Sequence, residues 1–296
     1  MICAREREQK RNALVDRRVT RCKAYPMNTP RPLRSTLSVI PLVAALLTAG
    51  CRTTYTTLVQ DRDTIYQLAP FVYILSGNYD GAITASQFKA AGNFGIGTFE
   101  GLDGEGVLLD GILYQVKGDG SVTIPEDARL MPFGACTLFD NDLRRTMKHI
   151  ASYDIFSKTL EASFADKQIF YAIRADGLFT NIRVRSCDKQ TKPYRPLAEA
   201  TKQQHEFTYE KVRGTLVGFW CPPTVPGSMS VPGFHMHFIS DDRKQGGHVL
   251  DFQADTLNII LDPTPRITID FSTPVAVPLI ETNIEQQVHE AESQRK

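Results

Sequence analysis

Alternating apolar and polar positions dominate the chain from residue 94 onward and predict β-strands, because successive strand side chains point to opposite faces. The runs are rich in branched and aromatic residues and are separated by glycine-containing turns. They lie within residues 106–124, 168–186, 215–222, 234–239, 248–254, 257–261 and 266–271. Asp-Gly pairs at 110–111, 119–120 and 176–177 are typical of hairpin turns.

Helical signals are short and few. Residues 84–93 (TASQFKAAGN) place Thr84 and Gln87 at the spacing of a capping box, and Gly92 suits a helix end. Residues 65–77 have mixed periodicity, and the polar tail 282–296 predicts a helix. The whole pattern predicts a β-rich α+β protein.

The chain divides into four predicted parts. Residues 1–50 form a signal segment and residues 51–63 a polar tether. Residues 64–165 form an N-terminal sheet half, and residues 166–296 form a C-terminal half that carries the candidate metal ligands.

Charge is distributed unevenly along the 296 residues, although the net charge is only +1. The first 34 residues carry ten Lys or Arg and three acidic residues, which leaves 24 basic and 30 acidic residues in the remainder. A folded part with a net charge of −6 argues against a nucleic-acid partner, which would require a basic face.

The basic N-terminal region precedes a segment typical of export signals. The apolar run 37–47 (LSVIPLVAALL) is too short to span a bilayer, which requires roughly 20 residues. Ala49 and Gly50 before Cys51 resemble a bacterial lipobox, so we expect an exported lipoprotein on the periplasmic face of a membrane, anchored only through lipid on Cys51. The alternative is an ordinary cleaved signal, and Met27 would open a compact one.

Four cysteines remain after such cleavage, and none belongs to a CxxC pair, so a cysteine metal site is unsupported. Cys187 and Cys221 are candidates for a disulfide or for buried free thiols.

Three of the six histidines lie in GFHMHFISDDRKQGGHVLDF, residues 233–252. On a strand, His235 and His237 point to the same face, and the turn-like residues that follow would return His248 to the same point. Three histidines that leave coordination positions open are the pattern of a catalytic metal site. The spacing alone leaves zinc, iron, manganese and copper as candidates. A cupin-like site, with Asp241 as the third ligand, is the alternative arrangement.

Longer motifs surround these histidines. In order they are FGIGTFEGLDGE (94–105), DGILYQVKGDGSV (110–122), FYAIRADG (170–177), KPYRPLAE (192–199), GTLVGFW (214–220) and PGFHMHFISDDRKQGGHVLDF (232–252). Together they resemble the alpha-acetolactate decarboxylase family over about residues 65 to 272. The resemblance implies a mixed sheet in the N-terminal half, a β-barrel-like C-terminal half and a homodimer. It also implies decarboxylation of 2-acetolactate to acetoin and CO2, with zinc held by His235, His237 and His248.

The same resemblance gives roles to residues outside the histidine cluster. Glu105 matches an active-site glutamate and Arg185 an active-site arginine, although strand alternation alone does not separate Arg185 from Arg183. Thr98 matches a threonine that lines the pocket, and Glu292 is the tail residue placed at the metal. We expect zinc to act as a Lewis acid that stabilises an enediolate, and Glu105 and Arg185 to assist protonation.

Two alternatives from other classes remain open at this point. One is a non-catalytic metal-binding lipoprotein, and the other is a cupin-like metal oxygenase. No organic cofactor is expected, because GIGTFEG (95–101) lacks the spacing of a nucleotide-binding loop.

Overall fold

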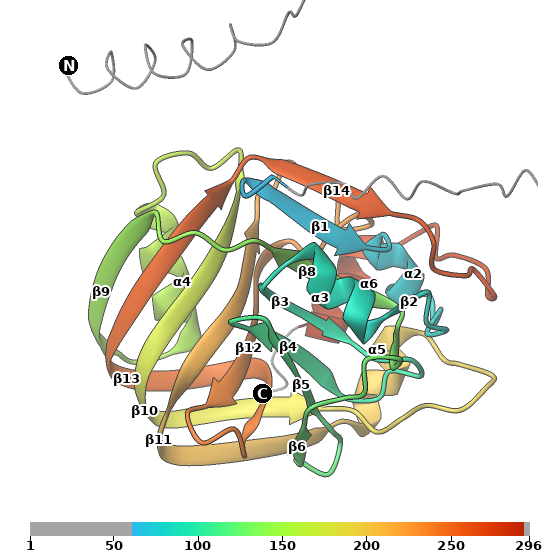
Figure 1. The fold of residues 1–296 in the computed structure, drawn as a ribbon, viewed down its shortest axis with the longest axis horizontal. Helices are drawn as coiled ribbons and strands as arrows, with labels where there is room; N and C mark the ends of the chain where they lie inside the picture. Colours follow the sequence, from blue (N-terminus) through green and yellow to red (C-terminus); the bar gives the residue numbers. More distant parts are fainter. Residues whose placement is uncertain (1–60, 293–296) are drawn as a thin grey trace, which may run out of the picture. The chain divides into compact units, whose positions relative to one another are not determined.

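Two large antiparallel-rich sheets make up most of the computed structural model, which describes residues 61–292 (Figure 1). The first sheet has seven strands in the order β14-β1-β8-β3-β4-β5-β6. Its strands, in chain order, are β1 (Thr64–Leu68), β3 (Phe94–Thr98), β4 (Glu105–Leu109), β5 (Ile112–Val116), β6 (Val122–Thr123), β8 (Phe133–Thr137) and β14 (Arg266–Asp270). The pairing of β1 with β14 is parallel and the others are antiparallel, so the predicted mixed sheet is confirmed.

The second sheet has five strands in the order β10-β11-β12-β13-β9, and β10 also pairs with β13. Its strands are β9 (Leu143–Ile150), β10 (Phe170–Ser186), β11 (His205–Cys221), β12 (Gly233–Ser240) and β13 (Gly246–Thr264). Neither sheet follows a single division of the chain, because β14 joins the first sheet and β9 joins the second (Figure 1).

The expected barrel-like form of this second sheet is not confirmed. The pairing between β10 and β13 curls the sheet, but β12 and β13 meet through only three residue pairs, from His237–His248 to Ile239–Gly246. β9 pairs with β13 alone and ends the sheet. The C-terminal half is therefore a strongly curled sheet rather than a closed barrel.

The Asp-Gly pairs behave differently from one another. Asp110 and Gly111 both have positive φ (53° and 81°) and form the predicted two-residue turn between β4 and β5. The turn predicted at Asp176-Gly177 is wrong, because β10 passes through it without interruption. A Cβ atom at Gly177 would lie 2.4 Å from the carbonyl oxygen of Thr256, so glycine is needed there for close strand packing.

Helices are short; Ala85–Ala91 contacts strands of the first sheet and Tyr153–Ala162 contacts strands of the second. The predicted helix at 84–93 is confirmed as α3, with the capping box between Thr84 and Gln87 formed. The tail helix is confirmed as α6, which contacts both α2 and α5. The helices are α2 (Phe71–Leu75), α3 (Ala85–Ala91), α4 (Tyr153–Ala162), α5 (Leu197–Ala200), the 3-10 turn Thr201–Gln203 and α6 (Ile284–Glu292). A small sheet pairs β2 (Ile83–Thr84) with β7 (Leu130–Met131).

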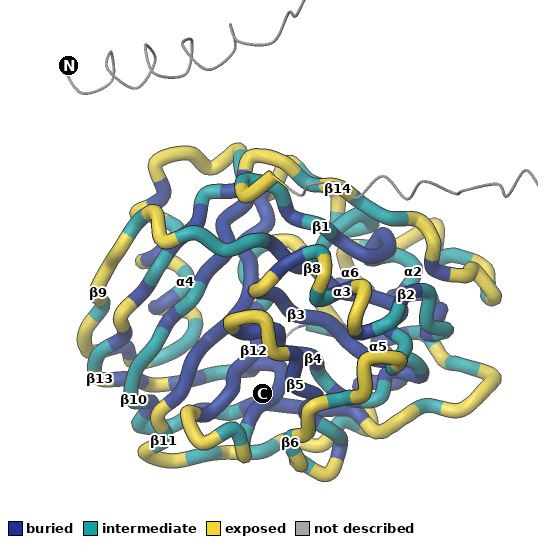
Figure 2. Tube along the Cα trace, viewed as in Figure 1, coloured by how far each residue is buried: buried dark blue, intermediate teal, exposed yellow. Residues whose placement is uncertain are grey.

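The two large sheets share an apolar layer, and buried residues follow their central strands (Figure 2). Ile96 and Val107 from the first sheet pack in one cluster with Val217 and Ile239 from the second. A separate cluster, which includes Phe156 of α4, covers the second sheet. The layer between the sheets brings β3 and β4 close to β11 and β12, and this arrangement positions the candidate site.

The signal segment, the lipobox at Cys51, most of the tether and the candidate start at Met27 lie outside the described residues. Within residues 61–292, no helix has the length and apolarity needed to cross a bilayer. Cys136, Cys187 and Cys221 are buried free thiols, so the candidate disulfide is not formed.

Candidate metal centre and active site

The three histidines of residues 233–252 converge on one point, as predicted. His235 and His237 lie on β12, and His237 is paired in register with His248 on β13. One nitrogen from each ring lies within 4.8 Å of the other two. Met236 and Phe238, which alternate with the histidines, are buried in the apolar cluster on the other face of the strand.

The hydrogen bonds of His237 leave one of its nitrogens free for a ligand. Its Nδ1 is 2.9 Å from the carbonyl oxygen of Gly106 on β4, so we assign the proton to Nδ1, which donates to that carbonyl. The Nε2 atom is then a lone-pair acceptor, and it is buried without a hydrogen-bond partner. A hydrogen bond from the other ring nitrogen to a backbone carbonyl fixes the tautomer of histidines that bind metals.

Burial keeps the three imidazoles neutral. It lowers the pKa of His235 to about 3, with a smaller contribution from the positive charge of Arg185. Burial also lowers the pKa of His237 and of His248 well below the usual value, and the positive charge of Arg185 adds to the effect. Neutral imidazoles with free lone pairs are the form that binds a cation.

Two carboxyl groups face the histidines. Glu105, the first residue of β4, has Oε2 3.5 Å from His237 Nε2. Glu292, the last residue of α6, has Oε2 3.8 Å from His235 Nε2 and 3.5 Å from His248 Nε2. The structure therefore brings the tail glutamate selected from the sequence to the histidine cluster.

Burial sets the protonation of both carboxyl groups. It raises the pKa of Glu105 to about 7, against the opposing effect of Arg185, and Glu292 raises it further. Burial also raises the pKa of Glu292, and Arg185 again opposes the change.

Arg185 is the third charged group of the site and is only 5% exposed. One of its terminal nitrogens is 3.9 Å from Glu292 Oε1, and the other donates to Gln204 Oε1 at 2.8 Å. Arg183 instead pairs with Glu206, and both side chains are about one-third exposed. β10 keeps an unbroken register with β11 from Arg183–Thr208 to Arg185–Glu206, so alternation does not separate the two arginines; they differ in burial and in partners.

Thr98 lines the same pocket from the end of β3 and is buried. Its hydroxyl donates to the carbonyl oxygen of Gly104 at 2.7 Å. This bond ties β3 to the loop that delivers Glu105, where Leu102 and Gly104 both have positive φ (56° and 79°).

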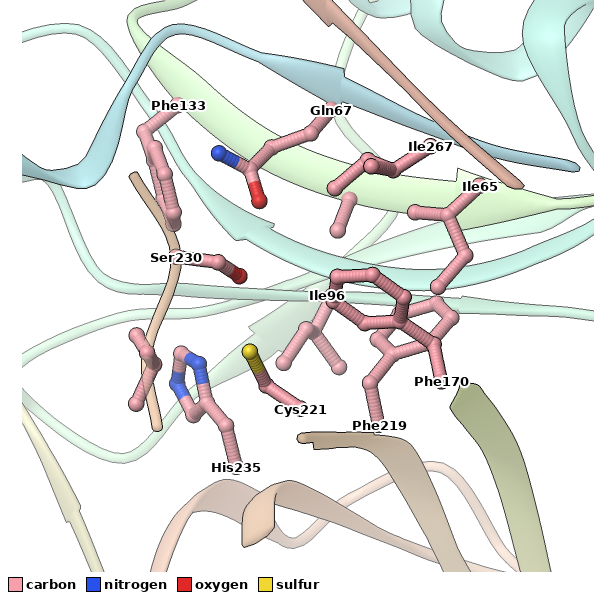
Figure 3. Close-up of a pocket in the computed structure, with 12 residues that line it drawn as sticks. Ile65, Gln67, Ile96, Phe133, Phe170, Phe219, Cys221, Ser230, His235 and Ile267 are labelled. Carbon is pink, nitrogen blue, oxygen red and sulfur yellow. The ribbon is translucent and has the colours of Figure 1, made fainter. Parts of the chain in front are cut away.

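The charged groups and the histidines line a pocket of ≈ 40 Å³ whose remaining wall is mostly apolar. That wall includes Phe71 and Ile74 of α2, Leu197 of α5, Leu102 and Phe133. A neighbouring cavity of ≈ 20 Å³ lies between the two large sheets and shares His235 and Phe133 with the pocket. Figure 3 shows the His235 ring at its edge, with Cys221 and Ser230 beside it and the Gln67 amide opposite.

Several contributors to the site were not found from the sequence. Gln204 binds Arg185 and the Gly106 carbonyl orients His237, but an isolated glutamine and a backbone carbonyl have no sequence signal. The apolar wall from α2 and α5 depends on how these helices pack. Asp241, the ligand of the cupin-like alternative, is an exposed turn residue that pairs with Arg213 at 3.4 Å.

Comparisons with known proteins agree with this arrangement. A family model described as alpha-acetolactate decarboxylase matches residues 65–276. The alpha-acetolactate decarboxylase of Brevibacillus brevis is 35% identical over 240 residues, which cover 79% of this chain and 83% of that protein. The alpha-acetolactate decarboxylase of Methanosarcina mazei is 40% identical over 203 residues, which cover 68% and 70% respectively.

A solved structure of alpha-acetolactate decarboxylase from Bacillus subtilis strain 168 superposes with a TM-score of 0.74 at 32% identity. The match covers 78% of this chain and 100% of that structure. The fold and the site define an enzyme of the carboxy-lyase class on a two-sheet α+β scaffold. The chain belongs to the alpha-acetolactate decarboxylase family.

Proposed function

We propose that this protein decarboxylates 2-acetolactate to acetoin and CO2 with the aid of a zinc ion. The observation that carries the proposal is the convergence of three neutral imidazole nitrogens within 4.8 Å, faced by Glu105, Glu292 and Arg185. Membership of the alpha-acetolactate decarboxylase family supports 2-acetolactate as the substrate.

The donor set fits a zinc ion. His235, His237 and His248 would hold it, and the buried Nε2 of His237, which has no hydrogen-bond partner, is the clearest sign of a site built for a cation. When bound, zinc would supply a Lewis acid that stabilises negative charge on substrate oxygens.

Arg185 would bind the substrate carboxylate. Its guanidinium is buried, and its Nε has no hydrogen-bond partner in the structure. A carboxylate is the ligand that a guanidinium binds best, through two parallel hydrogen bonds. Holding the departing group at Arg185 fixes the direction along which CO2 leaves, and therefore which face of the remaining carbon accepts a proton.

Glu105 would supply that proton. With its pKa raised to about 7 by burial, a substantial fraction of the carboxyl is protonated at neutral pH. Thr98 and Gly104 hold the loop from which Glu105 projects. The apolar wall from α2 and α5 limits access of water, so the protonation step depends on this positioned acid.

The first test is release of CO2 and acetoin from racemic 2-acetolactate, measured before chelation, after chelation and after zinc is returned. We expect activity to disappear with the chelator and to return with zinc. His235→Ala should lose at least about a hundredfold in activity. Removing a group that only hydrogen-bonds a metal ligand already costs about 10–100-fold, and His235 is itself a ligand in this proposal. His289→Ala, at an exposed position on α6, is the matched control and should keep its activity.

Each alternative class has a distinct outcome in this test. Stoichiometric metal without turnover of any 2-hydroxy-3-oxo acid would favour a metal-binding protein that is not an enzyme. Metal-dependent oxygen consumption would favour an oxygenase, whereas turnover under anaerobic conditions would exclude it.

The proposal includes an exported, lipid-anchored protein that acts as a homodimer. The basic and apolar segments before Cys51 support the anchor. Labelling cells with a radioactive fatty acid should mark the wild type and not Cys51→Ala. Light scattering of the enzyme without its lipid should give the mass of two chains.

A further inference from the structure

Gln204 is the residue through which Arg185 is fixed from outside the pocket. It lies directly after the 3-10 turn Thr201–Gln203 and before β11. Its Oε1 accepts a hydrogen bond of 2.8 Å from Arg185 Nη1. Arg185 itself pairs with Glu206 of β11 on one side and with the metal-site residue His248 of β13 on the other.

The orientation of the Gln204 amide is set by a second hydrogen bond. Its Nε2 donates to Glu206 Oε1 at 2.9 Å, so the carbonyl end must face Arg185. The other carboxylate oxygen of Glu206 accepts from Arg183 at 3.3 Å. A continuous series of hydrogen bonds therefore runs from the buried guanidinium to the partly exposed Arg183.

The partner of Arg185 in this series is neutral, and that is chemically significant. A carboxylate at the same place would form an ion pair with the guanidinium and would compete with the substrate carboxylate for it. An amide oxygen orients the guanidinium and adds no negative charge beyond that of Glu292, which lies 3.9 Å from the other terminal nitrogen. We infer that Gln204 is a positioning residue that holds Arg185 ready for a carboxylate ligand without neutralising it, and that Glu206 fixes the direction of the Gln204 amide.

This inference rests on the proposed function, so its test uses binding as well as turnover. Gln204→Glu keeps an acceptor but adds a charge, and Gln204→Met keeps the length but removes the acceptor. The control is Gln203→Glu, which adds the same charge at the exposed neighbouring position. The carboxylate probe is 2-hydroxyisobutyrate, and the neutral probe is acetoin. Both are tested on the zinc-loaded enzyme, by calorimetry and as inhibitors.

For Gln204→Glu we expect KM for 2-acetolactate and Kd for 2-hydroxyisobutyrate to rise about tenfold, the effect of losing one charge-assisted hydrogen bond. Inhibition by acetoin should be unchanged, because acetoin has no carboxylate. Gln204→Met should lower kcat about as much as kcat/KM, since Arg185 is then less well oriented in the reacting complex. Gln203→Glu should match the wild type in every measurement.

Equal weakening of both probes, or no change with either Gln204 variant, would overturn the inference. A purely structural role predicts the equal weakening, because a disturbed pocket does not distinguish an acid from a neutral ligand. If the wild type binds 2-hydroxyisobutyrate but never turns over 2-acetolactate, the proposed function fails. The Gln204 inference is then still decided by the calorimetry.

Discussion

Asp262 and Glu105 are both buried carboxyl groups whose pKa is raised to about 7, but they differ in their surroundings. Glu105 faces Arg185, which lowers its pKa against the effect of burial. Asp262 lies near Asp140, Asp142 and Asp63, whose charges raise its pKa further, and its Oδ1 has no hydrogen-bond partner. The first arrangement suits a proton donor, whereas the second makes the ionised form of Asp262 a cost to stability.

Asp262→Asn should remove that cost. Because the folded pKa of Asp262 is above the unfolded value, the folded state binds more protons, and its stability falls as pH rises from about 4 to about 7. The variant should equal the wild type below pH 4 and exceed it by about 1–3 kcal/mol at pH 8, as expected from a shift of this direction. Urea unfolding at pH 4, 6 and 8 measures this difference. Parallel stability curves for the two proteins would contradict the prediction.

The choice between Arg183 and Arg185 shows what residue-level reasoning could not supply. Strand alternation places positions two apart on one face, and it does not report that Arg185 is buried whereas Arg183 is partly exposed, because other parts of the chain cover only Arg185. The histidine cluster could be predicted because His235 and His237 lie on one uninterrupted strand. The turn after that strand then returns the chain to His248.

At the level of elements, the positions of most strands after residue 94 followed from the sequence, but β8, β9 and some strand limits did not. The predicted strands at 248–254 and 257–261 are one strand, β13, and the strand at 215–222 is the last part of β11. The same dipeptide, Asp-Gly, turns the chain at 110–111 and continues β10 at 176–177. Long-range packing of Gly177 against Thr256 decides the second case, and no local pattern reports it.

The α6 helix provides an element-level prediction. Val288 and Ala291 attach it to an apolar cluster shared with α2 and α5, and Glu292 follows directly. Val288→Asp would bury a charge in that cluster, so α6 should detach and activity should fall more than tenfold, although Val288 does not line the pocket. The measurements are turnover and the rate of proteolysis near the C-terminus.

The control for this prediction is His289→Asp, which places the same charge on the exposed side of α6. We expect it to keep both activity and resistance to proteolysis. Normal turnover in Val288→Asp would mean that Glu292 reaches the site without a docked helix, or is not needed there.

At the level of the whole molecule, the class of fold and its mixed sheet were predictable, but the form of the second sheet was not. Whether the curled sheet closes depends on how many residue pairs β12 and β13 share. Between β12 and β13 that number is three. Composition and alternation are the same for a closed barrel and for this sheet, so the sequence does not separate them.

Metal removal should destabilise the whole fold, because the candidate ligands join β12 to β13 and lie against β4 and α6. A ligand at a thousand times its Kd stabilises the folded state by about 4 kcal/mol, so chelation should lower Tm by roughly 5–15 °C. Differential scanning calorimetry with and without chelator measures this. His237→Ala should melt at one temperature in both conditions, and a wild type that does the same would contradict the prediction.

The pairing of β1 with β14 joins Tyr66 to Thr268, so the two ends of the described chain must meet before the first sheet is complete. The candidate site likewise needs Glu105, the β12–β13 turn and the last helix together. Contacts between residues so far apart in sequence make folding slow, and the candidate site should assemble late in folding. Zinc should therefore leave the rate of refolding nearly unchanged and slow only the rate of unfolding. The metal would then prolong the lifetime of the folded state without guiding the chain to it.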